Sequence, residues 1–338
     1  MKKLFLLTGA GLILSLASCV NEWPEPEYRL YDVTLRVHSD TEWLPDFEMT
    51  YSRAEALELE YIFKIYKAGT TTNPVKEFVI YSTDFKRSDF NVDVSLYPGD
   101  YDVYVWSDYC NADNDRSLFY ETSDFAKITY LTPYEGDSNN KDAFRGMKNF
   151  TIENTMYLNP TATEVINLER PLARYIFVAT DLEDFVDNEI TRGKLRGVTS
   201  REGSLEEYAS ELEDALGSYT VKIYYPLYMP SVFDNFLNKP IDSWTGISFE
   251  GQFTVISDKQ AQIGFDYVMM NGSDSYVQVA MELWDAEGEV ISRTSTINVP
   301  TKRDRTTLIY GRFLTSDEDA GVRIDPDFDG QFNIPYNR

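Results

Sequence analysis

The sequence predicts a mainly β protein with two sandwich domains. Apolar and polar residues alternate with a period of two over many short segments, as they do in half-buried strands. Turn-forming residues separate these segments, and only 182–189 and 204–216 have the spacing of an amphipathic helix. The length of 338 residues suggests two domains. We therefore expect two β-sandwiches with one or two short helices, the second of which caps a sheet.

The clearest strands of the first half are 33–37 and 90–96, in which every second residue is apolar. Residues 97–100 (YPGD) predict a turn, because proline presets its first corner and glycine permits a positive φ at the second. The next segment, 100–108, has large or apolar side chains on both faces, so we expect both faces to be at least half covered. Two further strands are expected at 59–66 and 77–81.

The character of the sequence changes between residues 131 and 163, where prolines and a run of turn residues (EGDSNN) leave few sustained alternations. We interpret this stretch as the linker region between a first domain, 30–162, and a second domain, 163–338. Short strands with turn signals between them suggest that the second domain is also a sandwich. They are expected at 163–181, 219–226, 249–256, 261–270, 276–284, 290–299 and 306–314.

The N-terminus has the features of a lipoprotein signal peptide. Two lysines precede an apolar run that ends at Leu16, and Ala17 and Ser18 stand directly before Cys19. The run is shorter than the ~20 residues that a membrane-spanning helix needs. We therefore expect that residues 1–18 are removed and that the Cys19 thiol carries lipid.

The segment 19–29 is predicted to be an extended tether between the lipid and the folded body. Its NEWPEPE stretch contains two prolines and three glutamates, which disfavour a helix and favour a solvated spacer. Acidic residues soon after the cysteine also resemble the surface-export signal of some Gram-negative lipoproteins. We expect a protein that is anchored to the outer membrane by lipid, does not span it, and has its body at the cell surface.

The composition argues against several classes of partner. The chain has 56 acidic and 31 basic residues, and its formal charge of −25 argues against binding to nucleic acid or to an anionic bilayer surface. Hydrophobic residues make up 43% of the chain, which is enough for a packed core. With Cys19 carrying lipid, Cys110 has no partner for an intramolecular disulfide. Packing must therefore stabilise the body.

Several segments resemble the fimbrillin-like lipoproteins of Bacteroidales, which are subunits and anchors of type V pili. They are RPLAR at 170–174, which opens a strand ending in ATD, the C-terminal NVP at 298–300 with TTLIYGRFLT at 306–315, and the LYPGDY hairpin at 96–101. The resemblance covers both halves of the chain. It implies two tandem transthyretin-like, Greek-key β-sandwich domains and a role in surface pili built from lipoprotein precursors.

The resemblance also implies a mode of assembly. In that family, an arginine-directed protease removes the lipidated segment and first strand of pilus subunits, and the opened groove accepts a strand from the next subunit. Anchor-type members keep their lipid. Arg29, Arg36 and Arg53 lie near the first predicted strand, but none has a context typical of a processing site. We therefore expect an accessory or anchor subunit, or a surface adhesin, with other pilus subunits as partners through strand addition.

Residues with catalytic potential are sparse. The single histidine, His38, ends a predicted strand with no cysteine nearby in sequence, so neither a zinc site nor a hydrolase triad is expected. Cys110 could be a nucleophile only beside a base, and we expect a buried or half-buried thiol instead. A glycosidase carboxylate pair stays open among 56 acidic residues, although a solvated acidic surface is the simpler interpretation. We predict no enzymatic activity, no catalytic residue and no cofactor.

One acidic segment approaches a calcium motif. Asp325, Asp327 and Asp329, followed by glycine, satisfy the opening of a calcium loop. Its twelfth position is Tyr336, where the loop needs glutamate, so we interpret the segment as an acidic turn and keep weak calcium binding as the alternative. The NADND loop at 111–115 is interpreted in the same way, because asparagine and aspartate favour left-handed turns.

Aromatic residues suggest a second function. The chain has 24 tyrosines and 5 tryptophans, which could stack on sugars in a glycan-binding surface lipoprotein of a polysaccharide-uptake system. Trp106 and Trp284 lie within predicted strands, where cross-strand packing explains them. Trp43 and Trp244 lie in loop-like contexts and are the candidates for contact with a glycan.

Overall fold

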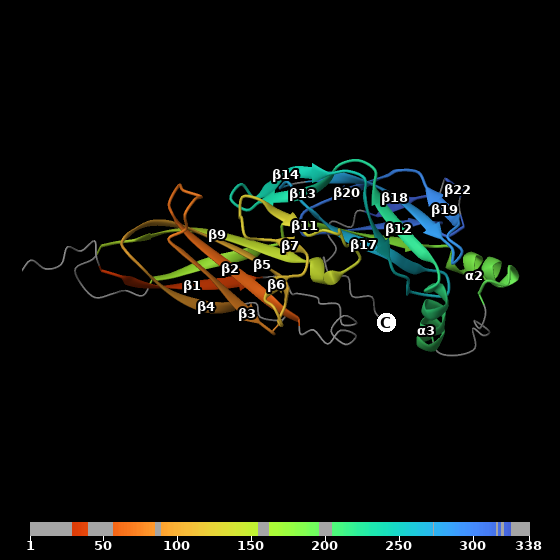
Figure 1. Cartoon of the computed structure of the whole chain (residues 1–338), viewed down its shortest axis with the longest axis horizontal. Helices are drawn as coiled ribbons and strands as arrows, with labels where there is room; N and C mark the ends of the chain where they lie inside the picture. The colour runs from red at the N-terminus through yellow and green to blue at the C-terminus, as the bar shows by residue number, and fades with distance from the viewer. Residues whose placement is uncertain are drawn as a thin grey trace, which may run out of the picture.

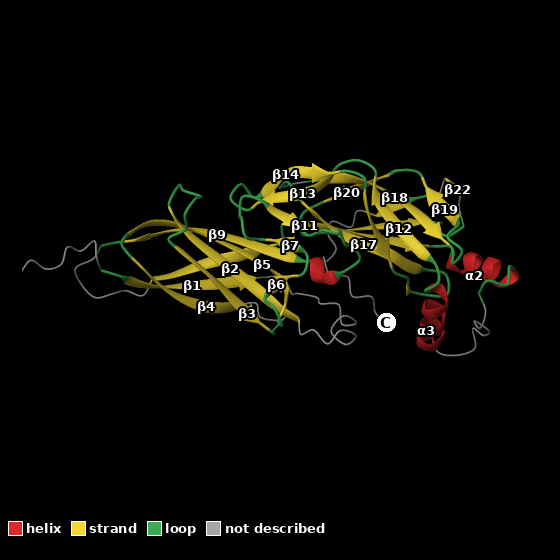
Figure 2. Ribbon diagram, in the orientation of Figure 1, coloured by secondary structure: helices red, strands yellow, loops and turns green. Residues whose placement is uncertain are grey.

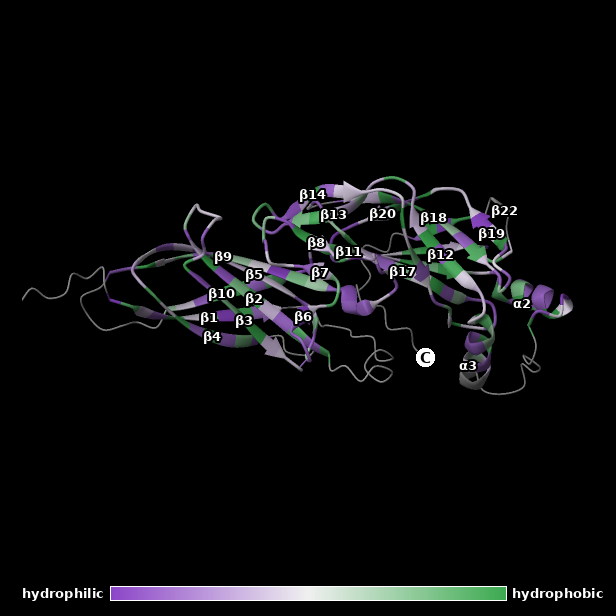
Figure 3. Ribbon diagram, viewed as in Figure 1, coloured by the Kyte–Doolittle hydropathy of each residue, from purple (hydrophilic) through white to green (hydrophobic). Residues whose placement is uncertain are grey.

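The computed structural model describes residues 29–39, 57–84, 89–154, 162–195, 205–272, 274–315, 317–318 and 321–325. Most of these residues lie in strands, so the predicted mainly β class is confirmed. The body is elongated, with the strands of the first half at one end and most strands of the second half at the other (Figure 1). Hydrophobic and hydrophilic residues alternate along many of the strands (Figure 3). In the part that the structure describes, neither α-helix is long and apolar enough to cross a bilayer.

The first half forms one sheet that folds over into two layers. At the fold, β9 and β10 share only two residue pairs, and a Cβ on Gly146 would lie 2.7 Å from Ile166 Cγ2, so glycine permits the close approach. Tyr61 and Phe90, from strands that are not neighbours in the sheet, touch across the core with ring centroids 4.8 Å apart. The order along the sheet is β3 (Lys76–Ser82), β2 (Leu57–Lys67), β5 (Gly99–Asn111), β9 (Ala143–Ile152), β10 (Ala162–Glu169), β1 (Tyr31–Ser39) and β4 (Asp89–Leu96), with β6 (Arg116–Ser117) on β5.

The predicted turn at 97–100 connects β4 to β5. Gly99 has a φ of +146°, and a Cβ there would lie 2.9 Å from Lys67 Nζ, so glycine suits both the backbone and the space. From Tyr101 to Asn111, every residue of β5 is buried. The expectation that both faces of this strand are covered is therefore confirmed.

The second half contains two larger sheets whose side chains share one core. All eight residues of β11 (Leu172–Ala179) are buried, because this strand lies in the middle of its sheet. That sheet has the order β16 (Thr254–Val255), β17 (Ala261–Met269), β11, β21 (Thr306–Gly311) and β23 (Arg323–Asp325). The other has the order β15 (Ile247–Gly251), β12 (Thr220–Tyr225), β18 (Ser275–Trp284), β19 (Val290–Thr294) and β22 (Asp317–Glu318), with β20 (Ile297–Thr301) on β18.

Both predicted helices are present. They are α2 (Leu182–Thr191) and α3 (Leu205–Leu216), and they lie at the end of the body farthest from the first sheet (Figure 2). Leu212 and Leu216 of α3 are fully buried in the core of the second half. The prediction that this helix packs against a sheet is confirmed, because α3 contacts β16.

A small sheet joins the two halves. Its order is β14 (Lys239–Trp244), β13 (Met229–Asp234), β8 (Ile128–Tyr130) and β7 (Tyr120–Glu121). The ladder between β8 and β13 pairs Thr129 with Val232 and Ile128 with Phe233, so backbone from opposite halves meets there. This sheet was not predicted from the sequence.

Two predictions about the middle of the chain are wrong. The stretch 131–163 is not only a linker, because it contains β9, which pairs with β5 over ten residues. The segment 163–181 is not one strand: β10 pairs with β1 and β9 in the first sheet, and β11 begins the second after Arg170 and Pro171. Proline has no backbone N–H for a ladder, which favours a break at this point. We propose residues 170–171, in place of 162–163, as the boundary between the two domains.

Candidate functional site

Part of the predicted linker lies directly on the second half of the chain. The backbone N–H of Asp137 donates to the Phe265 carbonyl at 3.0 Å, and the Asp137 carboxylate accepts from the N–H of Phe265 at 3.0 Å and of Gln252 at 2.6 Å. The next contact joins Tyr267 Oη to Asn139 Oδ1 at 3.0 Å. Residues 137–139 are thus hydrogen-bonded to Phe265 and Tyr267 of β17.

A buried ion pair lies at the end of this segment. Lys141, the last residue of the 3-10 helix η2 (Asn139–Lys141), places Nζ 2.6 Å from Oδ1 of Asp266 in β17. The side chains are 1% and 0% exposed. A charge is costly to bury without a partner, so each of these groups requires the other.

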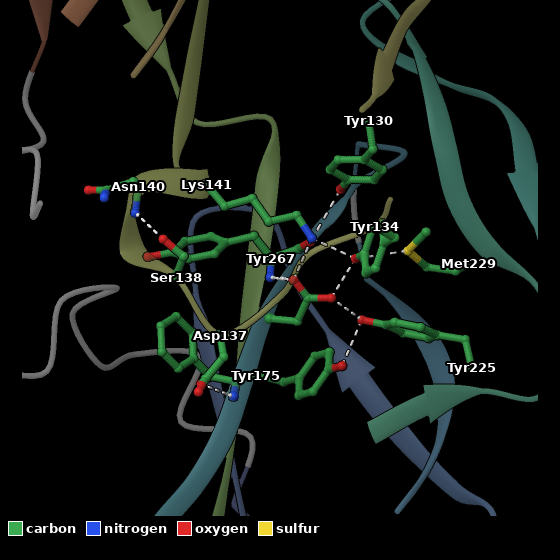
Figure 4. Close-up of polar contacts among 12 residues, drawn as sticks. Tyr130, Tyr134, Asp137, Ser138, Asn140, Lys141, Tyr175, Tyr225, Met229 and Tyr267 are labelled. Carbon is green, nitrogen blue, oxygen red and sulfur yellow. Dashed lines mark hydrogen bonds and ion pairs between the residues drawn. The ribbon is translucent and has the colours of Figure 1, made fainter. Parts of the chain in front are cut away.

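Tyrosine hydroxyls form hydrogen bonds to both members of this pair. Figure 4 labels Lys141 and the tyrosines and marks these bonds with dashed lines. Tyr134 Oη accepts from Lys141 Nζ at 2.6 Å and donates to Asp266 Oδ2 at 2.5 Å. Tyr225 donates to the same Oδ2 at 2.6 Å, and its oxygen lies 2.6 Å from that of Tyr175. We call Lys141, Asp266, Tyr134, Tyr225 and Tyr175 the junction cluster.

The electrostatics of the junction cluster follow from burial. Burial lowers the pKa of Lys141, although Asp266 and Glu135 raise it in opposition. Burial and the Asp266 charge raise the pKa of Tyr134 and Tyr225 well above the usual range. Both phenols therefore keep their protons at physiological pH and act as hydrogen-bond donors.

A small cavity opens beside the junction cluster. Its volume is about 160 Å³, and Tyr130, Tyr134 and Lys141 contribute to its wall together with Leu118, Phe119 and residues 131–133 and 135. The Lys141 ammonium lies over the rings of Tyr130 and Tyr134, 4.5 and 3.9 Å from their centroids. The lysine is therefore held by aromatic faces as well as by its carboxylate partner.

Two arginines form a second set of buried contacts, Arg170 at the boundary between the halves and Arg145 across it. Arg170 donates two hydrogen bonds of 2.7 Å to the Asp142 carboxylate. Arg145, on β9, donates from Nε to Asn235 Oδ1 at 2.9 Å and from Nη2 to the Asn235 carbonyl at 3.1 Å. The Arg145 contacts join β9 of the first sheet to the turn between β13 and β14.

The predicted lipidation and calcium residues are mostly outside the described part of the chain. Cys19, Asp327 and Asp329 fall there. Asp325 is an exposed residue at the end of β23, opposite Leu308 of β21. Among the residues that the structure describes, no group of three or more histidine, cysteine, aspartate or glutamate side chains is placed to hold a metal ion.

The structure places His38 and Cys110 on different strands. His38 is partly exposed on β1, opposite Asp89 and Asn167. Cys110 is fully buried on β5, opposite Glu58 and Ser117, and burial raises its pKa. A strand-end histidine and a buried thiol, as expected from the sequence, are confirmed.

The loop after β5 also follows the interpretation from sequence. The N–H of Asp113 donates to Asn111 Oδ1 at 2.7 Å, and Asp115 has a φ of +53°. These are the local hydrogen bond and the left-handed backbone that asparagine and aspartate favour in turns.

Trp106 and Trp284 lie within strands, as predicted. Trp106 is fully buried, and Trp43 is outside the described residues. Trp244 lies on β14, not in a loop, and is half-buried against Tyr130 and Tyr134, each with ring centroids 6.3 Å from its own. It therefore packs beside the junction cluster and does not form a free platform for a sugar.

Sequence reasoning missed the junction cluster. One signal was present: Asp266 stands inside a predicted strand, 261–270, whose surroundings are largely apolar. A carboxylate in such a strand needs a buried partner. Nothing local to Lys141 identifies it as that partner, because the two residues are 125 positions apart.

Comparison with solved structures finds distant likenesses. The chain is similar to a putative polysaccharide-binding protein of Bacteroides thetaiotaomicron, with 11% identity, a TM-score of 0.46 and coverage of 87% of this chain and 96% of the other. It is similar to the tip fimbrial protein Mfa3 of Porphyromonas gingivalis, with 14% identity, a TM-score of 0.44 and coverage of 87% and 98%. For the fimbrial anchor protein Mfa2 of the same organism, the values are 9%, 0.41, 83% and 91%.

No curated protein matches the sequence. A family of unknown function, DUF6562, matches residues 28–337, which is nearly the whole chain. The chain therefore belongs to this family.

Proposed function

We propose that this chain is a lipid-anchored protein of the outer-membrane surface that acts in adhesion or as an accessory or anchor subunit of pili, without catalysis. The sequence supports the location, because the first 19 residues have the parts of a lipoprotein signal. A short tether fits the position of β1, which begins at Tyr31, two residues after the end of the segment 19–29.

The observation that carries the proposal is the position of β1. This first strand lies between β10 and β4 and pairs with both along its length, from Val33 to Ser39 on one side and from Tyr31 to His38 on the other. Its inward side chains are almost fully buried in the core of the first half; they are Tyr31, Val33, Leu35 and Val37, with exposures of 4, 1, 0 and 1%.

This arrangement supports a role at the end of an assembly. A groove without β1 would expose the hydrogen-bonding edges of β10 and β4 and the pockets for alternate side chains, which a donated strand could fill. While β1 is retained, the chain fills this groove itself. Arg36, the arginine within β1, is exposed and hydrogen-bonded to Asp89, which agrees with an ordinary surface role. A subunit that keeps its lipid and its first strand fits an anchor or accessory position.

The lipid anchor can be tested by metabolic labelling with an alkyne fatty acid. We expect the wild-type chain to carry the label and to fractionate with the outer membrane, and the Cys19→Ser variant to lose both properties. Cys110→Ser is the matched control, because it removes the chain's other thiol and should leave labelling unchanged. Label retained in Cys19→Ser would contradict the anchor.

A glycan-binding surface lipoprotein is the second candidate, and two exposed aromatic side chains favour it. Tyr228 and Tyr276 are 71% and 65% exposed, so each presents a ring that could stack on a sugar. A glycan array probed with the wild-type chain and with the Tyr228→Ala and Tyr276→Ala variants tests this function. Binding that both variants lose would favour it, and an array without binding would favour assembly or adhesion to protein.

A further inference from the structure

The junction cluster brings an amine and a carboxyl group together in a buried, aromatic environment. Lys141 Nζ lies 2.6 Å from Oδ1 of Asp266, the oxygen that is bonded to Cγ. We propose that Lys141 and Asp266 join to form an intramolecular isopeptide bond between Nζ and Cγ. The bond would link the segment that follows β8 covalently to β17. This inference does not depend on the proposed function.

The reaction is a condensation that needs no oxidant or further reactant. The Lys141 ammonium gives up one proton, and the neutral Nζ attacks Cγ of Asp266. The nitrogen then gives up a second proton, and the Cγ–Oδ2 bond breaks. Oδ2 leaves as water with those two protons, and the remaining Nζ–H belongs to the new amide. The positive charge of Lys141 and the negative charge of Asp266 disappear together, so atoms and charge balance.

Tyr134 is placed to carry the proton. Its hydroxyl accepts from Lys141 Nζ at 2.6 Å and donates to Asp266 Oδ2 at 2.5 Å, so it connects the nucleophile to the leaving oxygen. Tyr225 donates to the same oxygen at 2.6 Å and stabilises the negative charge that develops there during the attack. Two phenols therefore assist departure of Oδ2, while Oδ1 faces the amine.

The surroundings favour the amide over the ion pair. Exposures of 1% and 0% keep bulk water from both groups, and desolvation penalises the charged forms of Lys141 and Asp266. Fixed proximity replaces a bimolecular encounter, which in model reactions corresponds to effective concentrations of ~10⁵–10⁸ M. The cavity of about 160 Å³ beside Tyr134 and Lys141 exceeds the ~30 Å³ of one water molecule, so it can accommodate the water that the reaction releases.

Peptide mapping of the full-length, detergent-extracted chain tests the bond. Trypsin should not cleave after an amidated Lys141, so we expect one branched product that joins peptide 128–145 to peptide 260–293. Its mass would be lower than the sum of the two peptides by one water. Complete cleavage after Lys141, with the linear peptides 128–141, 142–145 and 260–293 at full yield, would overturn the proposal.

Two variants of the reacting residues sharpen the test. Asp266→Asn should give a branched product of the same mass as wild type, because the amide then forms with loss of ammonia. Lys141→Arg keeps the positive charge but cannot form this amide, so it should give linear peptides only. A branched product that persists in Lys141→Arg would contradict the assignment of the nucleophile. If either variant fails to fold, the wild-type map still decides the proposal.

Tyr134→Phe tests the proton path separately, because it keeps the ring and removes the hydroxyl. We expect the branched fraction to fall several-fold in newly synthesised protein and to rise slowly with time. A purely structural hydroxyl would leave the rate unchanged. An unchanged rate would remove Tyr134 from the mechanism, while the wild-type map would still decide whether the bond exists.

Discussion

Asp142 accepts two hydrogen bonds from the buried guanidinium of Arg170, each 2.7 Å long. The residue before it, Lys141, pairs with Asp266, and Arg170 also reaches Asp304. Of these consecutive residues of opposite charge, Lys141 thus has its partner in β17 and Asp142 has its partner at the boundary between the two halves. Arg170 continues the chain of ion pairs to Asp304 in the second half.

We predict that Arg170→Met destabilises the protein strongly. The variant leaves the Asp142 carboxylate buried without its partner, which typically costs ~3–5 kcal/mol. The urea midpoint, followed by tryptophan fluorescence, should fall clearly. Arg312→Met is the matched control, since its partner Asp184 is exposed and such surface pairs contribute only ~0–1 kcal/mol. Equal shifts in the two variants would show that the buried Arg170–Asp142 pair contributes no more to stability than the exposed Arg312–Asp184 pair.

Leu35→Ala should destabilise the first half. Leu35 is fully buried in the middle of β1, and removing such a side chain costs ~2–5 kcal/mol, because a cavity remains. Val165→Ala on neighbouring β10 removes a side chain that is 41% exposed and should change the free energy of unfolding by no more than ~0.5 kcal/mol. Thermal unfolding measured by circular dichroism compares the two. A Leu35→Ala protein as stable as wild type would contradict the packing of β1 into the core of the first half.

Stability should fall as the pH rises because of Asp108. Burial and the neighbouring Glu60 raise the pKa of Asp108 well above its usual range, so the folded chain holds a proton that the unfolded chain releases. The stabilisation is complete at low pH and is lost as the pH rises through the raised pKa. Asp108→Asn, which mimics the protonated form, should therefore gain on the order of 1–3 kcal/mol relative to wild type at pH 8 and less at pH 5.

Urea midpoints across this pH range measure the effect of Asp108→Asn. Asp93→Asn, which removes an exposed carboxylate on β4, is the control. If the difference between Asp108→Asn and wild type were the same at pH 5 and pH 8, the retained proton would be refuted.

The Cys110 thiol should not react with alkylating reagents in the folded protein. Its side chain is fully buried and burial raises its pKa, so both access and thiolate are lacking. We expect no alkylation by iodoacetamide at pH 8 in native buffer and complete alkylation in guanidinium chloride, measured by mass spectrometry. A thiol introduced at exposed Thr70 in a Cys110→Ser background should react in the native state. Fast native alkylation of Cys110 itself would contradict its burial.

Local patterns predicted the local structure well. Both α-helices, the turn before Gly99 and the strand alternation around Leu35 depend on residues a few positions apart, and the sequence displays these directly. The strand β9 was missed, because Gly146 and the polar residues around it interrupt its alternation, while its stability comes from β5 some forty residues earlier. Long-range pairing overrides weak local preference at such positions.

The junction cluster could not be predicted from sequence patterns. Lys141 and Asp266 are separated by 125 positions, and Tyr134 and Asp266 by 132. Only the three-dimensional path, in which the chain after β8 lies along β17, brings them together. Asp266 alone gave a hint, because a carboxylate in an apolar strand requires a buried partner.

The most direct test of a surface assembly role combines proteolysis of intact cells with a gel of unboiled and boiled native protein, both probed by an antibody to the body of the chain. Our account predicts that the protease cuts the protein on intact cells. It also predicts that the unboiled sample contains SDS-resistant species larger than the monomer, which boiling dissociates. A protein that is protected on intact cells would contradict the surface location. An accessible protein that runs only as a monomer would contradict a role as a pilus subunit.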